Sequence, residues 1–217
     1  RPDFSVDLEA MIENGGEPSC GIIFPNPNAP TGVALELDRI RALMDRYPSD
    51  RVVVIDEAYV DFGAQSAIGM IADYENLIVT RTCSKSFSLA GLRLGYAFGN
   101  PDLIRALFTT KDSFNSYTVG RLTQSIGEIA MEDEEWIAEK TSRIVETRTF
   151  FSDALHAQGW EVLPSRANFV FARKTGLSGQ YIYETLKNRG ILVRYFNVEG
   201  IRDFVRITIG TKEDMTR

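Results

Sequence analysis

One loop of this chain carries the residue types that covalent chemistry on an aldehyde needs. It runs from Thr82 to Gly95 and places Lys85 among small hydroxyl residues, with Arg93 eight positions further on. Hydroxyl groups and a forked guanidinium bind phosphate, and glycines let the backbone come close to it. The lysine is then available to form a Schiff base with an aldehyde. A lone lysine in a polar loop is more often an ordinary solvated side chain, so this loop needs support from the rest of the sequence.

Two further polar groups follow another predicted strand. Asp56 comes directly after the β-branched run 51–55, and Tyr59 lies three residues later. A carboxylate beside a pyridine nitrogen favours the protonated form of that nitrogen, because opposite charges stabilise each other. A phenol can donate a hydrogen bond to a phenolate oxygen. Taken alone, Asp56 is equally well explained as a helix N-cap, and Tyr59 as a packing tyrosine with a satisfied hydroxyl.

These groups need a scaffold that brings distant loops together. Four short apolar runs are predicted strands: 20–24, 51–55, 77–80 and 94–98. They alternate with helical patterns, of which 35–47 is the clearest. The alternation predicts an α/β fold with a parallel, doubly wound sheet. Asn28, Asp56 and Lys85 each follow a strand, so we expect them to meet at the carboxyl edge of the sheet, where such folds bind ligands.

The second half of the sequence has a different pattern. Helical spacing covers 119–131 and the long stretch 134–158. Short predicted strands and one amphipathic helix follow at 160–163, 167–172, 178–189, 191–195 and 204–209. We therefore expect residues 1–118 to form part of a large ligand-binding domain. Residues 119–217 are predicted to supply interdomain helices and a small C-terminal α+β domain.

Composition limits the classes of function. The 217 residues are 44% hydrophobic and 25% charged, as in ordinary globular proteins. The net charge of −6 argues against nucleic-acid binding, and no apolar run approaches the roughly 18 residues that a membrane span needs. Cys20 and Cys83 lie in different segments without metal-ligand spacing. This fits a reducing compartment, the cytoplasm, and predicts no metal site.

Four motifs in a fixed order make the chain similar to a known family. They are Asn26-Pro27-Asn28-Ala29-Pro30-Thr31-Gly32, Asp56-Glu57-Ala58-Tyr59-Val60-Asp61-Phe62, Ser84-Lys85-Ser86-Phe87 with Gly91-Leu92-Arg93-Leu94-Gly95-Tyr96, and Phe204-Val205-Arg206-Ile207-Thr208-Ile209-Gly210. On these residues the chain resembles the pyridoxal-phosphate-dependent aminotransferases of fold type I and class II, in particular the histidinol-phosphate aminotransferases. The resemblance implies the fold of type I PLP transferases, with a mostly parallel sheet in the large domain, and a homodimer.

The resemblance also implies a role for each residue of the cofactor site. Lys85 holds pyridoxal 5'-phosphate as a Schiff base, Asp56 pairs with the ring nitrogen, and Tyr59 bonds the phenolate oxygen. Ala58 packs against one face of the ring. The phosphate group is bound by Thr82, Ser84 and Arg93.

On the substrate side, the resemblance implies that Arg206 clamps a carboxylate and that Arg194 grips the phosphate of a phosphorylated substrate. Two arginines on neighbouring strands suit a dianion. Asn168 is implied to lie near the substrate. Many relatives have an asparagine that bonds the phenolate oxygen where this chain has Ala29. Asn28, one residue earlier, either substitutes for it or only shapes the turn.

The leading hypothesis is transfer of an amino group between L-histidinol phosphate and 2-oxoglutarate, a step of histidine biosynthesis. One alternative is an aromatic amino-acid aminotransferase, for which Arg194 is dispensable, and another is a decarboxylase of a phosphorylated amino acid. A third is an inactive fragment that serves as a structural or binding module. The sequence starts without Met and stops just after Thr211 and Asp214, which resemble the capping start of a helix. We therefore expect a fragment that lacks roughly the first third of the family's length.

Overall fold

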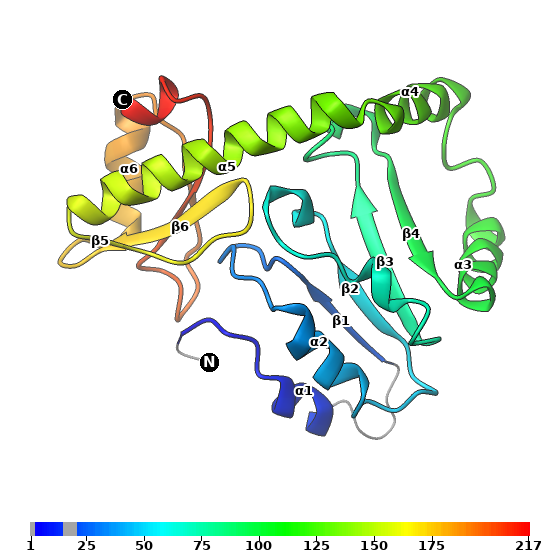
Figure 1. Cartoon of the computed structure of the whole chain (residues 1–217). Helices are drawn as coiled ribbons and strands as arrows, with labels where there is room; N and C mark the ends of the chain where they lie inside the picture. The colour runs from blue at the N-terminus through cyan, green and yellow to red at the C-terminus, as the bar shows by residue number, and fades with distance from the viewer. Residues whose placement is uncertain (1–2, 15–20) are drawn as a thin grey trace.

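Two sheets joined by long helices form the protein, for which we have a computed structural model describing residues 3–14 and 21–217 (Figure 1). The strands of the first sheet are β1 (Ile22–Pro25), β2 (Val53–Asp56), β3 (Leu77–Thr82) and β4 (Gly95–Gly99). Those of the second are β5 (Trp160–Val162), β6 (Phe169–Lys174), β7 (Arg194–Tyr195) and β8 (Val205–Thr208).

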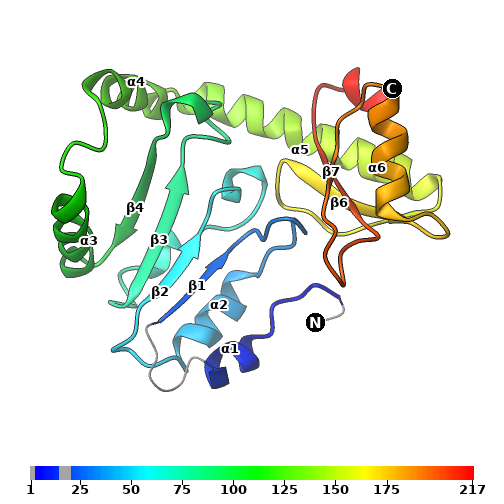
Figure 2. The same ribbon diagram turned by 180° about the vertical axis from the view of Figure 1, so that it is seen from behind.

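The first sheet is mostly parallel, as the sequence predicts. Its strands lie in the order β1-β2-β3-β4, which Figure 2 shows from behind; β1, β2 and β3 are parallel, and β4 is antiparallel to β3. A parallel crossover usually contains an α-helix. The connection from β3 to β4 instead holds the lysine loop and one short 3₁₀ turn, η3 (Ala90–Leu92), so the chain returns beside β3 in the opposite direction. Among the described strands the order never reverses, so the double winding that we expected is not seen here.

One face of the first sheet is buried under helix α2 (Leu37–Met44) and the 3₁₀ turn η2 (Ala67–Met70). The spacing of Ile40, Leu43 and Met44 puts all three on one side of α2, where they are buried. On the strands, Val53 and Ile55 point into this core. The opposite face carries Ile23, which is 73% exposed. The sheet is therefore anchored from one side.

Among the described N-terminal residues, only α1 (Leu8–Asn14) is helical. Cys20, with which the first predicted strand begins, lies outside the described residues. Before α1, the ring of Phe4 packs edge-on against Phe204, with ring centroids 5.3 Å apart. The N-terminal segment thus touches the second sheet.

Three consecutive helices connect the sheets: α3 (Pro101–Phe114), α4 (Arg121–Glu132) and α5 (Glu134–Ala157). The side chain of Asn100 caps α3 by accepting a hydrogen bond from the backbone N–H of Asp102 at 2.9 Å. The 24 residues of α5 span about 36 Å at 1.5 Å per residue, enough to run from one sheet along the other. The domain boundary predicted at 118/119 falls in the loop between α3 and α4 and stays a prediction.

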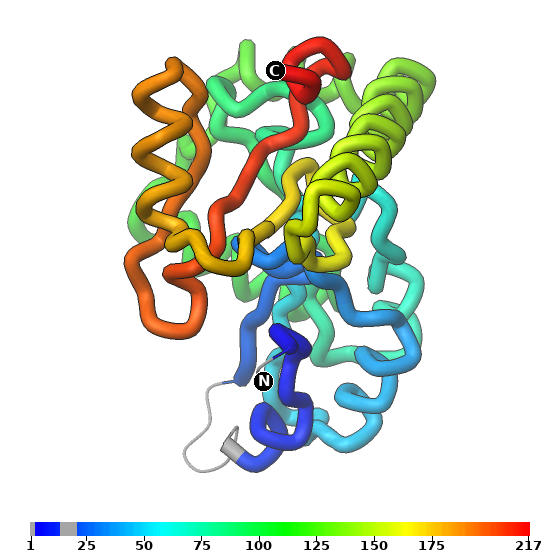
Figure 3. Tube along the Cα trace, turned by 90° about the vertical axis from the view of Figure 1, so that its left-hand side faces the viewer, coloured from blue at the N-terminus to red at the C-terminus, as the bar shows by residue number. Residues whose placement is uncertain are grey.

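The second sheet is antiparallel, with strands in the order β5-β6-β8-β7. Figure 3 shows its strands between α5 and α6 (Gly179–Asn188). Val170 and Ala172 of β6 pack with Leu155 of α5. Because side chains alternate along a strand, Phe169 and Phe171 lie on the other face of β6.

The chain ends in the 3₁₀ turn η4 (Asp214–Thr216), and the predicted cap before it is present. The carboxylate of Asp214 accepts a hydrogen bond from the backbone N–H of Thr211 at 3.1 Å, and the Thr211 hydroxyl accepts one from the N–H of Asp214 at 3.2 Å. No helix in the described ranges is both long and apolar enough for a membrane span.

Candidate active site

The polar groups picked out in the sequence lie at one edge of the first sheet. Asn28 follows β1, Asp56 ends β2 and Lys85 follows β3. Since β1, β2 and β3 are parallel neighbours, their carboxyl ends share this edge. In the register of the sheet, Asp56 lies opposite Thr80, just before the lysine loop. The convergence that we expected from the strand pattern is therefore present.

The amine of Lys85 lies over an aromatic ring and has no acidic partner. Its Nζ is 5.2 Å from the centroid of the Tyr59 ring, a cation–π distance. Among the described residues, no carboxylate lies within ion-pair distance of it. Two backbone hydrogen bonds fix the loop: Ser88 N–H to the carbonyl of Lys85 at 3.1 Å, and Leu89 N–H to that of Cys83 at 2.9 Å. The loop thus presents a free amine on a fixed backbone.

The carboxylate of Asp56 closes a tight turn at the end of β2. One oxygen, Oδ1, accepts a hydrogen bond from the backbone N–H of Ala58 at 3.0 Å. This is the local capping role that we considered as the alternative, although the segment that follows is only a 3₁₀ turn, η1 (Val60–Phe62). The side chain makes no other hydrogen bond within the described part of the chain. Asp56 is half-buried, so the second oxygen remains available to a ligand.

Two hydroxyl groups meet where the lysine loop begins. The hydroxyl of Thr82 donates to that of Ser84 at 2.9 Å and accepts a hydrogen bond from the backbone N–H of Ser84 at 3.1 Å. Cys83 between them is fully buried, and burial raises the pKa of its thiol. The thiol therefore stays neutral, and the hydroxyls are the groups left to bind an anion.

Arg93, which we grouped with these hydroxyls, is exposed in this structure. Its backbone is left-handed, with φ of 54°. Its Nη1 donates to the carbonyl of Ala90 at 2.9 Å, so the guanidinium folds onto its own turn. The next residue, Leu94, accepts a hydrogen bond from the backbone N–H of Cys83 at 3.0 Å, which keeps the Arg93 turn beside the lysine loop.

The side chain of Asn28 belongs to the turn after β1. The side-chain Nδ2 of Asn28 donates to the hydroxyl of Thr31 at 2.8 Å, and the backbone carbonyl of Asn28 accepts a hydrogen bond from the backbone N–H of Gly32 at 2.7 Å. Of the two roles that the sequence left open, the observed contacts match the shaping of the turn. The carbonyl of Gly32 in turn accepts a hydrogen bond from the N–H of Arg166 at 2.8 Å, so this turn also touches the segment before β6.

The two arginines expected on the substrate side are paired across β7 and β8. Arg194 and Arg206 are direct partners in the register, and their guanidinium carbons lie 5.3 and 5.9 Å from the centroid of the Phe196 ring. The Nε of Arg206 is buried and has no hydrogen-bond partner in the described part of the chain. A buried donor without a partner is costly, so this atom points to an anionic ligand.

A line of ring contacts joins the arginines to the lysine. The guanidinium of Arg206 lies 4.9 Å from the centroid of Phe169, and that ring packs edge-on against Tyr59 at 5.2 Å. Tyr59 lies under Lys85, as described above. We did not pick out Phe169 from the sequence, although the alternation of Phe169 and Phe171 in β6 could have indicated an aromatic face. The half-buried Asn168 and Ala58 each adjoin this line.

A buried arginine of α5 holds together the two segments that carry the rings of this line. The Nη1 of Arg148 donates to the carbonyl of Phe62 at 2.8 Å and to that of Ala167 at 2.7 Å. The first acceptor follows Tyr59 and the second precedes Phe169 in the chain. Burial, and then the nearby Arg166, lower the pKa of Arg148. Nothing in the helical pattern of α5 distinguishes this residue from its solvated neighbours.

Comparisons with known proteins show the family of this chain. The histidinol-phosphate aminotransferase of Syntrophus aciditrophicus (strain SB) is 76% identical over 217 residues, which are 100% of this chain and 60% of that protein. The protein of the same name from Gluconacetobacter diazotrophicus is 50% identical over 203 residues, 94% of this chain and 57% of that protein. This chain therefore spans about 60% of the length of these curated relatives.

Solved structures give the same result. The histidinol-phosphate aminotransferase of Sinorhizobium meliloti, in complex with pyridoxal-5'-phosphate, superposes with a TM-score of 0.86 at 28% identity, covering 97% of this chain and 58% of that one. The enzyme of that name from Clostridium acetobutylicum gives 0.88 at 25% identity, covering 99% and 66%. The family model for aminotransferases of class I and II matches residues 1–217. The chain belongs to the aminotransferase class I and II family, with the fold of type I PLP-dependent enzymes.

Proposed function

We propose that the protein to which this chain belongs transfers an amino group between L-histidinol phosphate and 2-oxoglutarate, in histidine biosynthesis, with pyridoxal 5'-phosphate on Lys85. The names of the relatives support this activity. The observation that carries it is the line of contacts from Lys85 through Tyr59 and Phe169 to Arg206. It puts a free amine at one end and anion-binding side chains at the other.

The residues at the sheet edge fit pyridoxal phosphate. Within residues 3–14 and 21–217, the amine of Lys85 has no acidic partner, and one carboxylate oxygen of Asp56 has no hydrogen-bond donor. When bound, the cofactor supplies an aldehyde for the amine and a ring that withdraws electrons from the substrate. Asp56 would hold a proton on the ring nitrogen, and Tyr59 would donate to the phenolate oxygen. Thr82, Ser84 and Arg93 would bind the phosphate of the cofactor, Ala58 would pack against its ring, and Asn28 would lie beside it.

The second sheet binds the substrate by its charge. Arg206 and Arg194 together present two guanidinium groups, which suit the dianionic phosphate of histidinol phosphate and a carboxylate of 2-oxoglutarate. Asn168 lies beside this site. Lys85 Nζ, released when the substrate amine takes its place on the cofactor aldehyde, would move the proton of the substrate carbon that bears the amino group to the carbon of that aldehyde. The Tyr59 ring beneath the amine limits where this proton can be delivered.

Spectroscopy with the purified chain tests this proposal. Cofactor bound to a lysine absorbs in the visible, and Lys85→Ala should abolish that band, because the other lysines of the described residues lie in α3, α5, β6 and α6 and after β8. Lys187→Ala is the matched control, since Lys187 is exposed on α6. Survival of the band in Lys85→Ala, or its loss in Lys187→Ala, would show that Lys85 is not the attachment point.

We also propose that the protein is a cytoplasmic homodimer. Large apolar side chains lie exposed on α4, with Leu122 at 79% and Ile129 at 68%, which supports an interface there. The free, buried thiol of Cys83 suits a reducing compartment. Sedimentation of the protein should give twice the mass of one chain, and Leu122→Glu with Ile129→Glu should give the mass of a single chain.

A further inference from the structure

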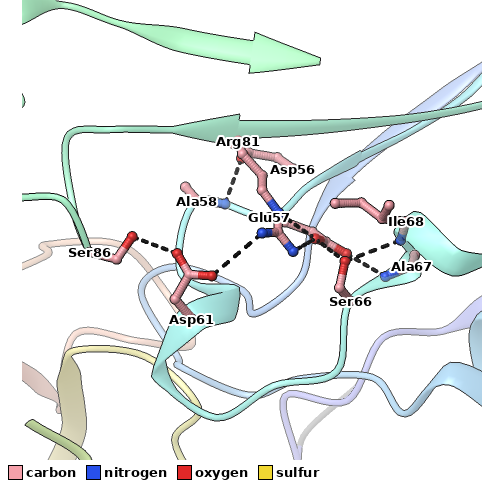
Figure 4. A network of polar contacts seen from close by, with 9 residues as sticks. All are labelled: Asp56, Glu57, Ala58, Asp61, Ser66, Ala67, Ile68, Arg81 and Ser86. Carbon is pink, nitrogen blue, oxygen red and sulfur yellow. Dashed lines mark hydrogen bonds and ion pairs between the residues drawn. The ribbon is translucent and has the colours of Figure 1, made fainter. Parts of the chain in front are cut away.

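A buried group of charges ties the end of β2 to the lysine loop (Figure 4). Its centre is Glu57, the residue after Asp56, whose side chain is 0% exposed. One carboxylate oxygen of Glu57 accepts hydrogen bonds from Nε and Nη2 of Arg81, at 3.1 and 3.0 Å. The hydroxyl of Ser66 and the backbone N–H of Ala67 donate to the same carboxylate at 2.7 and 2.6 Å. Glu57 is thus held by four donors from two segments, strand β3 and the turn at residues 66–67.

The contacts between Glu57 and Arg81 form one branch of this group of charges. A second branch runs from Arg81 to the lysine loop. The Nη1 of Arg81 lies 3.5 Å from Oδ1 of Asp61, an ion pair. The other oxygen of Asp61 accepts a hydrogen bond from the hydroxyl of Ser86 at 2.5 Å. Ser86 is 4% exposed and directly follows Lys85. An unbroken chain of polar contacts therefore leads from the neighbour of Asp56 to the neighbour of Lys85.

Arginine is the residue type that this position requires. A guanidinium has donors on two edges, so one group can pair with Glu57 and Asp61 at once, whereas the ammonium of a lysine is a single point of charge. The cation also matters, because a carboxylate as deeply buried as that of Glu57 would be strongly destabilising without it. The side chain of Arg81 is 19% exposed and lies on β3, between the two branches.

We propose that Arg81 is a positioning residue that sets Asp56 and Lys85 relative to each other, by holding Glu57 on one side and Asp61 with Ser86 on the other. The inference rests on the proposed function for the roles of Asp56 and Lys85. Arg81 acts through its neighbours in this scheme and need not touch cofactor or substrate. Cutting one branch should therefore loosen the lysine loop while leaving the fold in place.

Two serine variants separate positioning from general stability. Ser86→Ala cuts the branch to the lysine loop, and Ser66→Ala removes the same kind of donor from the Glu57 end. In cofactor-free protein, amide hydrogen exchange is read at Ser88 and Leu89, whose N–H groups close the loop. Exchange should become about tenfold faster in Ser86→Ala, the change expected for one lost hydrogen bond to a charged group, and should stay at the parent rate in Ser66→Ala.

Arg81→Lys tests the bridging geometry. It keeps a cation beside Glu57, so the protein should fold, but it should show the fast exchange of Ser86→Ala because a lysine holds only one branch. After loading with pyridoxal phosphate, both variants should bind the cofactor and lose the visible circular dichroism of the parent, which reports a fixed orientation of the bound ring. Ser66→Ala should keep that signal.

Equal exchange in Ser86→Ala and Ser66→Ala, or parent-like exchange and dichroism in Arg81→Lys, would overturn the proposal. Absence of any visible band in the parent protein would instead refute the proposed cofactor chemistry. The exchange measurements need no cofactor, so they would still decide whether Arg81 holds the loop.

Discussion

The two sheets place charged side chains in different ways. In the first sheet, Asp56 is the last residue of β2 and Lys85 lies in the loop after β3, and backbone hydrogen bonds with a buried ion network fix both positions. In the second, Arg194 and Arg206 lie within strands, and the ring of Phe196 packs against both. The first arrangement depends on individual polar atoms, and the second on strand register and packing.

Because of this difference, we expect mutations in the two sheets to have different effects. Loss of one polar partner in the first sheet should disturb geometry and chemistry more than stability, since the loop can relax towards water. Loss of a ring from the second sheet removes buried apolar area and leaves a cavity, so it should cost stability first. Phe169 is where the two meet, because it touches Tyr59 from the first sheet and Arg206 from the second.

The largest effect is expected for Phe169→Ala. Phe169 is 2% exposed, and a buried phenylalanine replaced by alanine costs about 3–5 kcal/mol of unfolding free energy. Urea unfolding measures this cost. Phe114→Ala is the matched control, since Phe114 is 79% exposed and should change stability by no more than about 0.5 kcal/mol. If both variants cost the same, the ring of Phe169 does not join the two sheets.

The next largest effect is expected at Arg148 of α5, which bonds the backbone before β6 and the backbone after β2. Arg148→Met should cost about 1–3 kcal/mol of unfolding free energy, because the carbonyls of Phe62 and Ala167 lose the one donor, Nη1, that they share. The methionine keeps the bulk of the side chain in α5. Arg143→Met on the same helix is the control, because its side chain is 65% exposed. A loss in Arg148→Met no greater than in Arg143→Met would mean that solvent already satisfies these carbonyls.

Under the proposed function, we expect substrate choice to depend on Arg194, the exposed member of the arginine pair. Arg194→Ala should lower kcat/KM for histidinol phosphate by about tenfold to a hundredfold, as expected for a lost charge-assisted contact of about 1.5–3 kcal/mol. Turnover of an aromatic amino acid should fall much less, because its carboxylate needs only Arg206. Steady-state kinetics with both substrates checks this. An equal loss for both would favour the aromatic aminotransferase that the sequence left open.

The same contrast explains what the sequence could predict. Lys85, Asp56 and Tyr59 lie in short motifs directly after apolar runs, so their place at the sheet edge follows from local pattern. The direction of β4 does not follow from local pattern, because it depends on the path of the loop that connects β3 to β4. The bond from Arg148 to Phe62 joins residues 86 positions apart, and helical periodicity carries no signal for it. Glu57 and Arg81 stand in motifs that we quoted or beside them, yet their pairing became evident only from the register of β2 and β3.

The smallest expected effect tests how tightly the lysine loop is packed. Burial raises the pKa of the Cys83 thiol, so the folded chain keeps this proton above about pH 8.5, where the thiol of the unfolded chain loses it. The folded state then binds more protons than the unfolded state, and stability falls as pH rises through this range.

Cys83→Ala removes this contribution, so urea unfolding at pH 7 and pH 10 should show a smaller loss for the variant than for the parent. Tyr96, whose pKa burial also raises, is present in both proteins and cancels in the comparison, as does Cys20. Equal losses would mean that water reaches Cys83 in the folded protein. The backbone of the lysine loop would then be less firmly held than the strands that carry the arginines, and the contrast between the two sheets would extend from how they place their charges to how rigidly they hold them.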